Sequence, residues 1–531
     1  MRDFHMPGRS TAHGINGMAA TSHPLATLAA LETLRWGGNA VDAAVSAAAV
    51  LAVVEPQSTG IGGDCFVLFA PRGSGQVIAY NGSGRAPAAA DAQWFRERGI
   101  EAIDPDSAHA VTVPGAIEAW SQLIGDHGRK GLDDLFQPAI RYAQNGYPVF
   151  PRVAHDWRRE AARLARDPVA KRIFLTSGAP PAPGDLHAQP ELAATLKRIA
   201  AEGPEAFYRG EIAEDMVGRL REKGGLHTLA DFAAHKGEYT TPIRTSYRGY
   251  DVFECPPNGQ GLTVLLMLDI LEGFQLGELD PLGPERLHLE IEAGRLAYRD
   301  RNALIADPAH ARVPIEHLLS ASYADGLRAH IRRDRAMTRL PAPGSTGAEE
   351  RDTVYLAVVD GHLNAVSFIN STWWSFGSGI VAPKSGVVLH NRGAGFVLEP
   401  HHPNVIAPGK RPFHTIIPGM LARDGRAIMP FGVMGGDYQP FGHVHLLTNM
   451  LDFGMDPQEA IDLARVFHDG EAVVVERGIP EATVQGLAAR GHRIVAREDP
   501  LGGGQAILID WNRGVMTGGS DPRKDGCALG L

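Results

Sequence analysis

The sequence predicts an α+β protein in which a helical half is followed by a strand-rich half. Up to about Leu340, alanine- and leucine-rich stretches with helical periodicity dominate. The next stretch, LPAPGSTGAEE, replaces that periodicity with Pro, Gly, Ser and charge, which is typical of an exposed, flexible segment. From Thr353 onward, short apolar runs alternate with Gly, Asp and Asn, which indicates strands. The change from helices through a loose segment to strands is the main organisational signal.

The expected elements have recognisable start or stop signals. Residues 25–36 are rich in Ala and Leu and end at two glycines, and Asn39 is placed to cap a second helix at residues 40–53. A glycine-rich loop then leads into a buried strand at residues 65–70. Further helices are expected at residues 190–202, 204–223 and 284–300, and strands in the stretches TVYLAVVD, AVSFINS, GVVLHN, AIMPFGVM and AILIDW.

The composition is that of an ordinary globular protein of 531 residues, 44% hydrophobic and 21% charged. The net charge of −10 offers no basic field to nucleic acid. The start of the chain lacks the apolar core of a signal peptide, and no run of about 18 apolar residues appears, so we expect a cytoplasmic protein without a membrane partner. Cys65, Cys255 and Cys527 are too few for a disulfide framework or a metal cluster.

Thr353 is the candidate nucleophile, because it follows the flexible segment and opens the first strand of the second half. A threonine hydroxyl is a weak nucleophile and needs a base, and a free N-terminal amine with a pKa of roughly 7.7–8.0 can take its proton. Thr353 has such an amine only after the bond between Asp352 and Thr353 is cut. We therefore expect an inactive precursor whose Thr353 hydroxyl attacks the Asp352 carbonyl and cleaves its own chain.

The same chemistry needs an oxyanion site and a second hydroxyl. Gly435 and Gly436 lie between an expected strand and a helix that begins near Gln439, so their backbone N–H groups can face an anion. Ser371 lies on the strand after the one that Thr353 begins, where its hydroxyl can reach the nucleophile. Either feature alone is also compatible with an ordinary turn or a surface serine.

Candidate binding groups lie near glycines. Arg85 and Arg392 stand in glycine-rich stretches and could hold a carboxylate through two parallel hydrogen bonds, although a surface salt bridge is the alternative. His401, His402 and His414 have no carboxylate at a convincing metal-ligand spacing. The sequence also lacks a nucleophile elbow and a phosphate-binding loop, so we expect neither a metal nor a cofactor.

The chain resembles the γ-glutamyltransferase (glutathione hydrolase) proenzymes over nearly all its length. The resemblance runs collinearly through GGNAVDAAV, EPQSTGIGGDCF, TVPGAIEAW, GPEAFYRGEIA, LAYRDRNALIADP, MGGD and SDPR. It implies a four-layer αββα fold and cleavage into a large subunit, residues 1–352, and a small subunit, residues 353–531, that stay together. It also implies that Thr353 is the nucleophile, that Gly435 and Gly436 form the oxyanion site and that Ser371 supplies the supporting hydroxyl.

The substrate-binding positions depart from the family pattern. The arginine that holds the α-carboxylate aligns with Ser83, and the aspartate that takes the α-amino group aligns with Gly395. A neighbouring glutamine aligns with Arg392, an asparagine with Trp373 and a serine pair with His414-Thr415. The resemblance thus implies intact chemistry with a rebuilt binding site, for which we expect contributions from Arg85, Asn370, Arg392, His414 and Thr415.

The sequence therefore predicts a self-processing amidohydrolase or acyltransferase that acts on a γ-glutamyl or similar small carboxylate-bearing amide. The acyl group would pass to water or to an amine acceptor, and dimerisation of the two-subunit enzyme is left open. One alternative is an oxamate-type amidohydrolase that releases ammonia, because oxamate amidohydrolases carry similar NRGA, PFHT and MGGD stretches. A second alternative is an unprocessed, catalytically silent binding protein.

Overall fold

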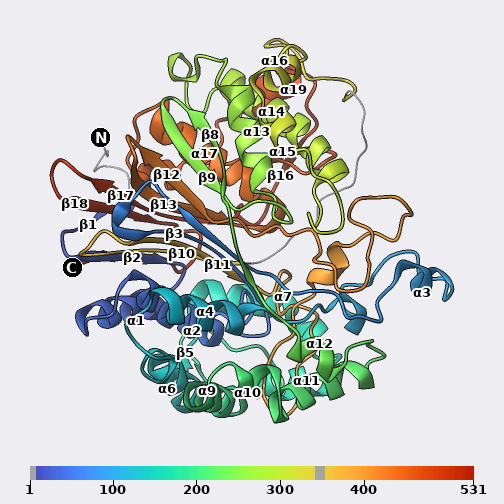
Figure 1. Ribbon diagram of the computed structural model, residues 1–531. Coiled ribbons are helices and arrows are strands. Elements are labelled where there is room, and N and C mark those ends of the chain that lie inside the picture. The colour runs from blue at the N-terminus through green and yellow to red at the C-terminus, as the bar shows by residue number, and fades with distance from the viewer. Residues whose placement is uncertain (1–7, 341–352) are drawn as a thin grey trace.

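Two seven-stranded sheets stack face to face, and helices cover the outer face of each (Figure 1). This computed structural model describes residues 8–340 and 353–531. The arrangement is the four-layer αββα sandwich that the family resemblance implies. No helix within the described ranges is long and apolar enough to cross a membrane.

Both sheets are antiparallel and take strands from both halves of the chain. The first sheet has the order β1 (Ala12–Gly14), β18 (Val515–Ser520), β17 (Gly503–Asp510), β13 (Arg426–Met434), β12 (Gly419–Arg423), β9 (Tyr250–Glu254) and β8 (Ile243–Tyr247). The second has the order β19 (Cys527–Gly530), β2 (Gly17–Thr21), β10 (Val354–Asp360), β11 (Ala365–Ser371), β3 (Asp64–Ala70), β4 (Ile78–Gly82) and β7 (Glu238–Thr240). Each sheet therefore contains strands that precede Thr353 and strands that follow it.

Strand β10 shows why the sheets are buried on both faces. Tyr355, Ala357 and Val359 belong to the core between the sheets, together with Met434 and Ile507 of the other sheet. The alternate residues Val354, Leu356 and Val358 belong instead to the core beneath the helices. Since successive side chains of a strand point to opposite faces, a strand covered on both sides reads as an unbroken apolar run.

The outer helices pack on the sheets through apolar faces. Helix α2 (Ala40–Val54) is buried along its whole length, and Asn39 caps it by accepting hydrogen bonds from Val41 N and Asp42 N, as predicted. The second sheet is also covered by α1 (Pro24–Arg35) and α4 (Ala116–His127). The first sheet is covered by α13 (Gly261–Leu271) and α17 (Gln439–Leu451), and α14 (Pro284–Leu304) packs on α13.

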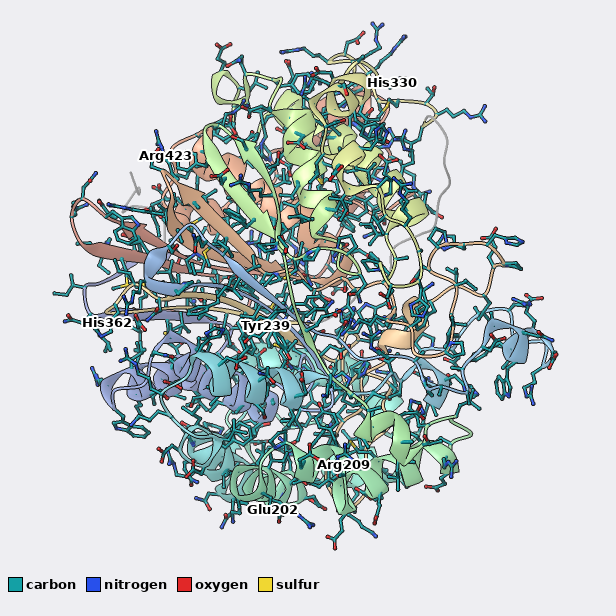
Figure 2. The ribbon with its side chains drawn as sticks, viewed as in Figure 1. Glu202, Arg209, Tyr239, His330, His362 and Arg423 are labelled. Atoms are coloured by element: carbon teal, nitrogen blue, oxygen red, sulfur yellow. The ribbon has the colours of Figure 1, made fainter. Side chains whose placement is uncertain are left out.

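Other helices and short strands complete the outer layers. The helices are α3 (Ala92–Arg96), α5 (Leu132–Leu135), α6 (Gln137–Asn145), α7 (Pro151–Leu164), α8 (Pro168–Phe174), α9 (Pro190–Glu202), α10 (Glu205–Tyr208), α11 (Glu211–Glu222), α12 (Leu229–Ala233), α15 (Ile315–Leu318), α16 (Ala321–Arg328), α18 (Pro457–Asp462) and α19 (Glu481–Ala489). The strands are β5 (Tyr147–Pro148), β6 (Leu186–His187), β14 (Val466–His468), β15 (Val473–Val475) and β16 (Ile494–Ala496). Exposed charged side chains such as Glu202 on α9 and Arg423 on β12 project from these layers (Figure 2).

Three expectations about local structure are wrong. Residues 204–223 form two helices rather than one, because Gly210 adopts a φ of 84° that no helix tolerates. The stretch GVVLHN does not join a sheet, because it folds back on residues 380–382 and His390 N bonds to the glycine loop at Gly62 O. The first half is also richer in strands than predicted, since β1–β4 and β7–β9 precede Thr353.

Candidate active site

Thr353 and Ser371 meet at the same end of neighbouring strands. Strands β10 and β11 pair with Val354 opposite Asn370, so Thr353 comes beside Ser371. The two hydroxyl oxygens lie 3.1 Å apart, and both residues are buried. Ser371 Oγ also accepts a 2.8 Å hydrogen bond from Trp373 N, which fixes the orientation of the serine. The contact expected between these two hydroxyls is therefore present; Asp352 lies outside the described residues.

The glycine pair forms a turn at this end of the stacked sheets. Ser367 Oγ on β11 donates to Phe431 O on β13 across the intersheet space. Four residues later, β11 ends at Ser371, and β13 ends at Met434, directly before Gly435. Gly435 has a φ of 126° and Gly436 a φ of 58°, a backbone region that favours glycine. A Cβ atom on Gly435 would lie 2.9 Å from Gly502 Cα. Both the conformation and the packing therefore require glycine here.

A buried polar group holds the glycine turn from one side. Gln260 Nε2 donates to Gly436 O at 3.0 Å and to Thr415 O at 2.7 Å. Arg301 Nη1 donates to Gln260 Oε1 and to Asp437 Oδ1, each at 2.8 Å. Sequence reasoning missed Gln260, Arg301 and Asp437, although the aspartate that follows two glycines was a usable signal.

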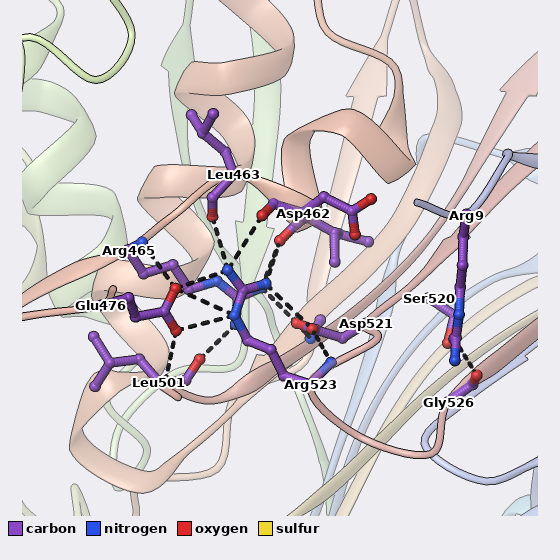
Figure 3. A network of polar contacts seen from close by, with 12 residues as sticks. Arg9, Asp462, Leu463, Arg465, Glu476, Leu501, Ser520, Asp521, Arg523 and Gly526 are labelled. Carbon is purple, nitrogen blue, oxygen red and sulfur yellow. Dashed lines mark hydrogen bonds and ion pairs between the residues drawn. The ribbon is translucent and has the colours of Figure 1, made fainter. Parts of the chain in front are cut away.

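A second buried network holds the loop at Leu501, next to the glycine turn (Figure 3). Glu476 accepts a 2.7 Å hydrogen bond from Arg523 Nη2 and a 2.8 Å bond from Leu501 N. Arg465 donates to Leu501 O and pairs with Asp521. Leu501 precedes the glycine that packs against Gly435, so these ion pairs fix the neighbour of the turn. The SDPR motif thus contributes its Asp and Arg to this support.

Arg392 lies in a buried cluster with Trp373, which follows Ser371 by two residues. Its Nη1 donates to Thr415 Oγ1 at 2.8 Å, and its guanidinium carbon lies 5.1 Å from the centre of the Trp373 ring. A Cβ atom on Gly395 would lie 3.6 Å from Trp373 Cη2. The indole therefore occupies the space next to Gly395, the position where the family pattern has an aspartate. Arg392 and Thr415 are both completely buried.

Asp64 is a functional candidate that sequence reasoning missed. It begins β3 directly opposite Ser371. Its Oδ1 accepts hydrogen bonds from Gly84 N at 3.0 Å and Gly115 N at 3.3 Å, and its Oδ2 lies 2.9 Å from His414 Nε2. Burial alone would raise the pKa of this carboxyl, but His390, His414 and Arg392 together hold the pKa well below its usual range. Asp64 is therefore an ionised carboxylate inside the protein.

The two histidines around Asp64 are neutral. Burial and the charge of Arg392 lower the pKa of His414 to about 3. Burial likewise lowers the pKa of His390, whose Nδ1 accepts from Arg392 N at 3.1 Å and whose Nε2 lies 3.0 Å from Thr112 O. The charges in this buried cluster are therefore one carboxylate, Asp64, and one guanidinium, Arg392.

The remaining predicted binding residues lie in other contacts. Asn370 Nδ2 donates to Thr59 Oγ1 at 2.8 Å and Gly60 O at 3.1 Å, which fastens the glycine-rich loop to β11. Arg85 is partly exposed; its Nη1 donates to Gly409 O at 3.2 Å and lies 3.8 Å from Asp307 Oδ2. The structure thus joins Arg392, His414 and Thr415 in one cluster and gives Arg85 separate partners.

An open cleft of about 470 Å³ reaches the glycine turn from the surface. Its lining includes Gly435, Gly502 and Trp374. Charged side chains of α7, among them Arg159 and Arg163, form another wall. The glycine turn therefore lines a cleft that is open to solvent, whereas Arg392 is completely buried.

One group of side chains in the described ranges could hold a metal ion. The ligand atoms of His288, Glu292 and His492 lie within 4.8 Å of one another. His288 Nδ1 is 2.7 Å from His492 Nε2, and Glu292 accepts hydrogen bonds from Arg295 and Met337 N. These side chains thus already serve as partners for one another and for the segment before residue 340.

The fold and this geometry define the class of N-terminal-nucleophile hydrolases: a threonine at a strand start in an αββα sandwich, with a second hydroxyl and a glycine turn. Comparison with known families is more specific, because the family model described as gamma-glutamyltranspeptidase matches residues 26–531. The chain belongs to the γ-glutamyltranspeptidase family and is an enzyme of amide-bond hydrolysis and acyl transfer.

Several characterised relatives align over almost the whole chain. The glutathione hydrolase-like YwrD proenzyme of Bacillus subtilis (strain 168) is 38% identical, over 98% of this chain and 99% of the relative. The acylase ACY 1 proenzyme of Pseudomonas sp. (strain SE83) is 35% identical, over 98% and 95%. The oxamate amidohydrolase proenzyme of Klebsiella pneumoniae subsp. pneumoniae is 34% identical, over 97% and 98%. The crystal structure of cephalosporin acylase from Bacillus halodurans superposes with a TM-score of 0.93 at 41% identity, over 100% and 99%.

Proposed function

We propose that this protein is a self-processing N-terminal-threonine amidohydrolase that cleaves a small carboxylate-bearing amide through an acyl-enzyme. The observation that carries the proposal is the 3.1 Å contact between the Thr353 and Ser371 hydroxyls at the start of β10. The glycine turn at the same end of the sheets supplies backbone N–H groups for an oxyanion. The proenzyme names of the relatives agree with a chain that must be cut before it acts.

The proposed processing step uses the hydroxyl that later performs catalysis. Thr353 Oγ attacks the Asp352 carbonyl, the C–N bond of that peptide breaks and the Thr353 nitrogen takes a proton to become a free amine. Water then hydrolyses the resulting ester, which restores the Thr353 hydroxyl and leaves a carboxylate on Asp352. Ser371 Oγ stabilises the reacting hydroxyl by hydrogen bonding.

In turnover, the free amine of Thr353 takes the hydroxyl proton as the oxygen attacks the substrate carbonyl. The N–H groups of Gly435 and Gly436 hold the oxyanion, a contribution of about 3–4 kcal/mol per donor in comparable sites. The scissile C–N bond breaks, and the leaving amine takes the proton from the Thr353 ammonium. Water or an acceptor amine then attacks the acyl-enzyme and releases the acyl product.

The acyl group that suits the site around Arg392 has a carboxylate and no ammonium. Arg392 offers a buried guanidinium, which pairs with carboxylates through two parallel hydrogen bonds. Gly395 has no carboxylate for an ammonium group, and Trp373 fills the space beside it. We therefore infer weak hydrolysis of glutathione and preference for an acyl group such as glutaryl. The acylase names among the relatives agree with an acyl group other than γ-glutamyl.

The open cleft favours a leaving amine larger than ammonia. It has room for a substantial group directly beside Gly435, whereas the release of ammonia from oxamate would need only a small site. Because one relative is named an oxamate amidohydrolase, oxamate is included among the substrates to be tested. A silent binding protein would not need the paired hydroxyls and the glycine turn.

The test is a substrate panel on purified, processed protein. We expect kcat/KM to be highest for glutaryl para-nitroanilide and much lower for γ-glutamyl para-nitroanilide, glutathione and oxamate. Efficient glutathione hydrolysis would contradict the rebuilt acyl site. High activity on oxamate alone would favour the ammonia-releasing enzyme, and an intact single band on a denaturing gel would favour the silent protein.

A further inference from the structure

Asp64 determines which nitrogen of His414 carries the proton. An ionised carboxylate only accepts hydrogen bonds, so the 2.9 Å contact to Asp64 Oδ2 requires the proton on His414 Nε2. The other oxygen of Asp64 is held by the backbone N–H groups of Gly84 and Gly115, so the carboxylate cannot rotate freely. In a neutral ring, His414 Nδ1 is then a lone-pair acceptor.

That acceptor is buried, and no donor in residues 8–340 or 353–531 reaches it. His390 next to it provides the contrast, because both of its ring nitrogens have partners: Arg392 N for Nδ1 and Thr112 O for Nε2. A buried acceptor without a donor costs stability, so such groups usually serve a ligand or an ordered water. His414 is also adjacent in sequence to Thr415, which binds the guanidinium of Arg392.

We propose that His414 is a specificity-determining residue whose Nδ1 accepts a hydrogen bond from a neutral O–H group beside the substrate's carboxylate, and that Asp64 is the positioning residue that fixes this tautomer. The proposal rests on the proposed function, because it names the acyl group of the same reaction. A hydroxyl is favoured over an ammonium group because Arg392 places a positive charge next to the ring. The substrate class is therefore a monoamide of an α-hydroxy dicarboxylic acid, attacked at the amide carbonyl that lies farther from the hydroxyl.

The first arm of the test compares two substrates that differ by one hydroxyl. These are glutaryl para-nitroanilide and the γ-para-nitroanilide of α-hydroxyglutaric acid. We expect wild-type kcat/KM to favour the hydroxyl substrate on the order of 10- to 100-fold, the factor expected when one buried acceptor is otherwise left unpaired. Equal kcat/KM for the two substrates would overturn the proposal. If the processed enzyme cleaves neither of the two substrates, the proposed function is overturned instead.

The second arm compares His414→Gln with His414→Asn. The glutamine variant keeps a donor near Asp64 but has no polar atom near the Nδ1 position. The asparagine variant keeps a polar atom at that position. We expect the hydroxyl preference to fall to about onefold in His414→Gln and to persist in part in His414→Asn. Denaturing gels that show both fragments confirm that each variant folds and processes. A preference that survives in His414→Gln contradicts the assignment.

The third arm needs no substrate. In the processed wild-type enzyme, ¹⁵N NMR should show His414 as a neutral ring protonated at Nε2. In Asp64→Asn the amide can be either donor or acceptor, so we expect a mixture of tautomers and a smaller hydroxyl preference. A wild-type ring protonated at Nδ1, or an unchanged tautomer in Asp64→Asn, would overturn the role of Asp64 even if the proposed function holds.

Discussion

Thr353 combines two requirements that rarely meet in one residue. As a β-branched residue it suits the start of β10, and as a hydroxyl it contacts Ser371 at 3.1 Å. Its amine is part of a peptide bond until the chain is cut. In the proposed mechanism, processing therefore creates the base and the new chain end in one step, and we expect no activity before it.

The first prediction tests this coupling. Thr353→Ala should abolish cleavage, because the variant has no hydroxyl to attack the preceding carbonyl. Thr353→Ser is the matched control and should still be cut, since it keeps the nucleophile. Mass spectrometry of the wild type should find a fragment of 531 − 352 = 179 residues. Efficient cleavage of Thr353→Ala at the same bond would show that another group performs the reaction.

The second prediction separates the two arginines expected near the substrate. Arg392→Ala should lower kcat/KM on glutaryl para-nitroanilide by a factor that corresponds to roughly 2–5 kcal/mol of lost transition-state binding, because the substrate carboxylate would be buried without its cation. Arg85→Ala should have a much smaller effect, since Arg85 already binds Asp307 and Gly409 O. Steady-state kinetics of both processed variants give the comparison. If both match wild type, the carboxylate lies elsewhere.

At the residue scale, the sequence pattern predicted contacts between residues on consecutive strands. Ser371 could be paired with Thr353 because the two lie on consecutive strands joined by a short turn. Asp64 and His414 could not be paired, because 350 positions separate them and no sequence pattern links the two residues. The positions of Arg392 and Arg85 looked alike in sequence, and only packing separates them.

At the scale of elements, the glycine turn depends on what surrounds it. Strand β13 delivers Gly435 to the end of the sheets, but Gln260 and the loop at Leu501 determine where the turn lies. The strand, the turn and the helix after it were predictable from one stretch of sequence. Their supports come from several distant segments of the chain, so no local pattern could predict them.

The third prediction concerns this support. Glu476→Gln should weaken the bonds to Arg523 and Leu501 N and cost on the order of 3 kcal/mol of unfolding free energy, as for other broken buried ion pairs (Figure 3). We also expect kcat to fall more than KM changes, because Gly502 would no longer position the oxyanion turn. Glu471→Gln is the control, since its pair with Arg493 is exposed. Urea unfolding and steady-state kinetics provide both readouts, and equal behaviour of the two variants would contradict the role of the network.

At the scale of the whole molecule, the chemistry needs only groups that the chain supplies. In the proposed cycle, Thr353 supplies the nucleophile and its base, and the N–H groups of Gly435 and Gly436 supply the oxyanion donors. The cluster of His288, Glu292 and His492 belongs to α14 and the loop after α19; its two histidines contact each other, and Glu292 accepts from Arg295 and Met337 N. Nothing in the proposed cycle passes through that cluster.

The fourth prediction follows from this independence. Processed enzyme that is treated with a strong chelator and then dialysed should keep full activity on glutaryl para-nitroanilide, because each step is assigned to a side chain or a backbone N–H group. Metal analysis before and after treatment shows whether an ion was present and removed. A loss of activity that a divalent ion restores would contradict this prediction.

The last prediction concerns the two fragments as one folding unit. A division into a helical half and a strand-rich half would allow each to fold separately, but the strands of both sheets interleave across the cleavage point. Strand β10 lies between β2 and its hairpin partner β11, and β11 pairs with β3. The inner face of β10 is covered by the other sheet and its outer face by α2, so the small fragment alone would expose long apolar strand edges. We therefore expect residues 353–531 expressed alone to be insoluble, whereas the processed fragments should co-elute on gel filtration and separate only in denaturant. Co-expression of the two fragments as separate chains should rescue solubility; a soluble, folded small fragment would show that the interleaved strands are not required.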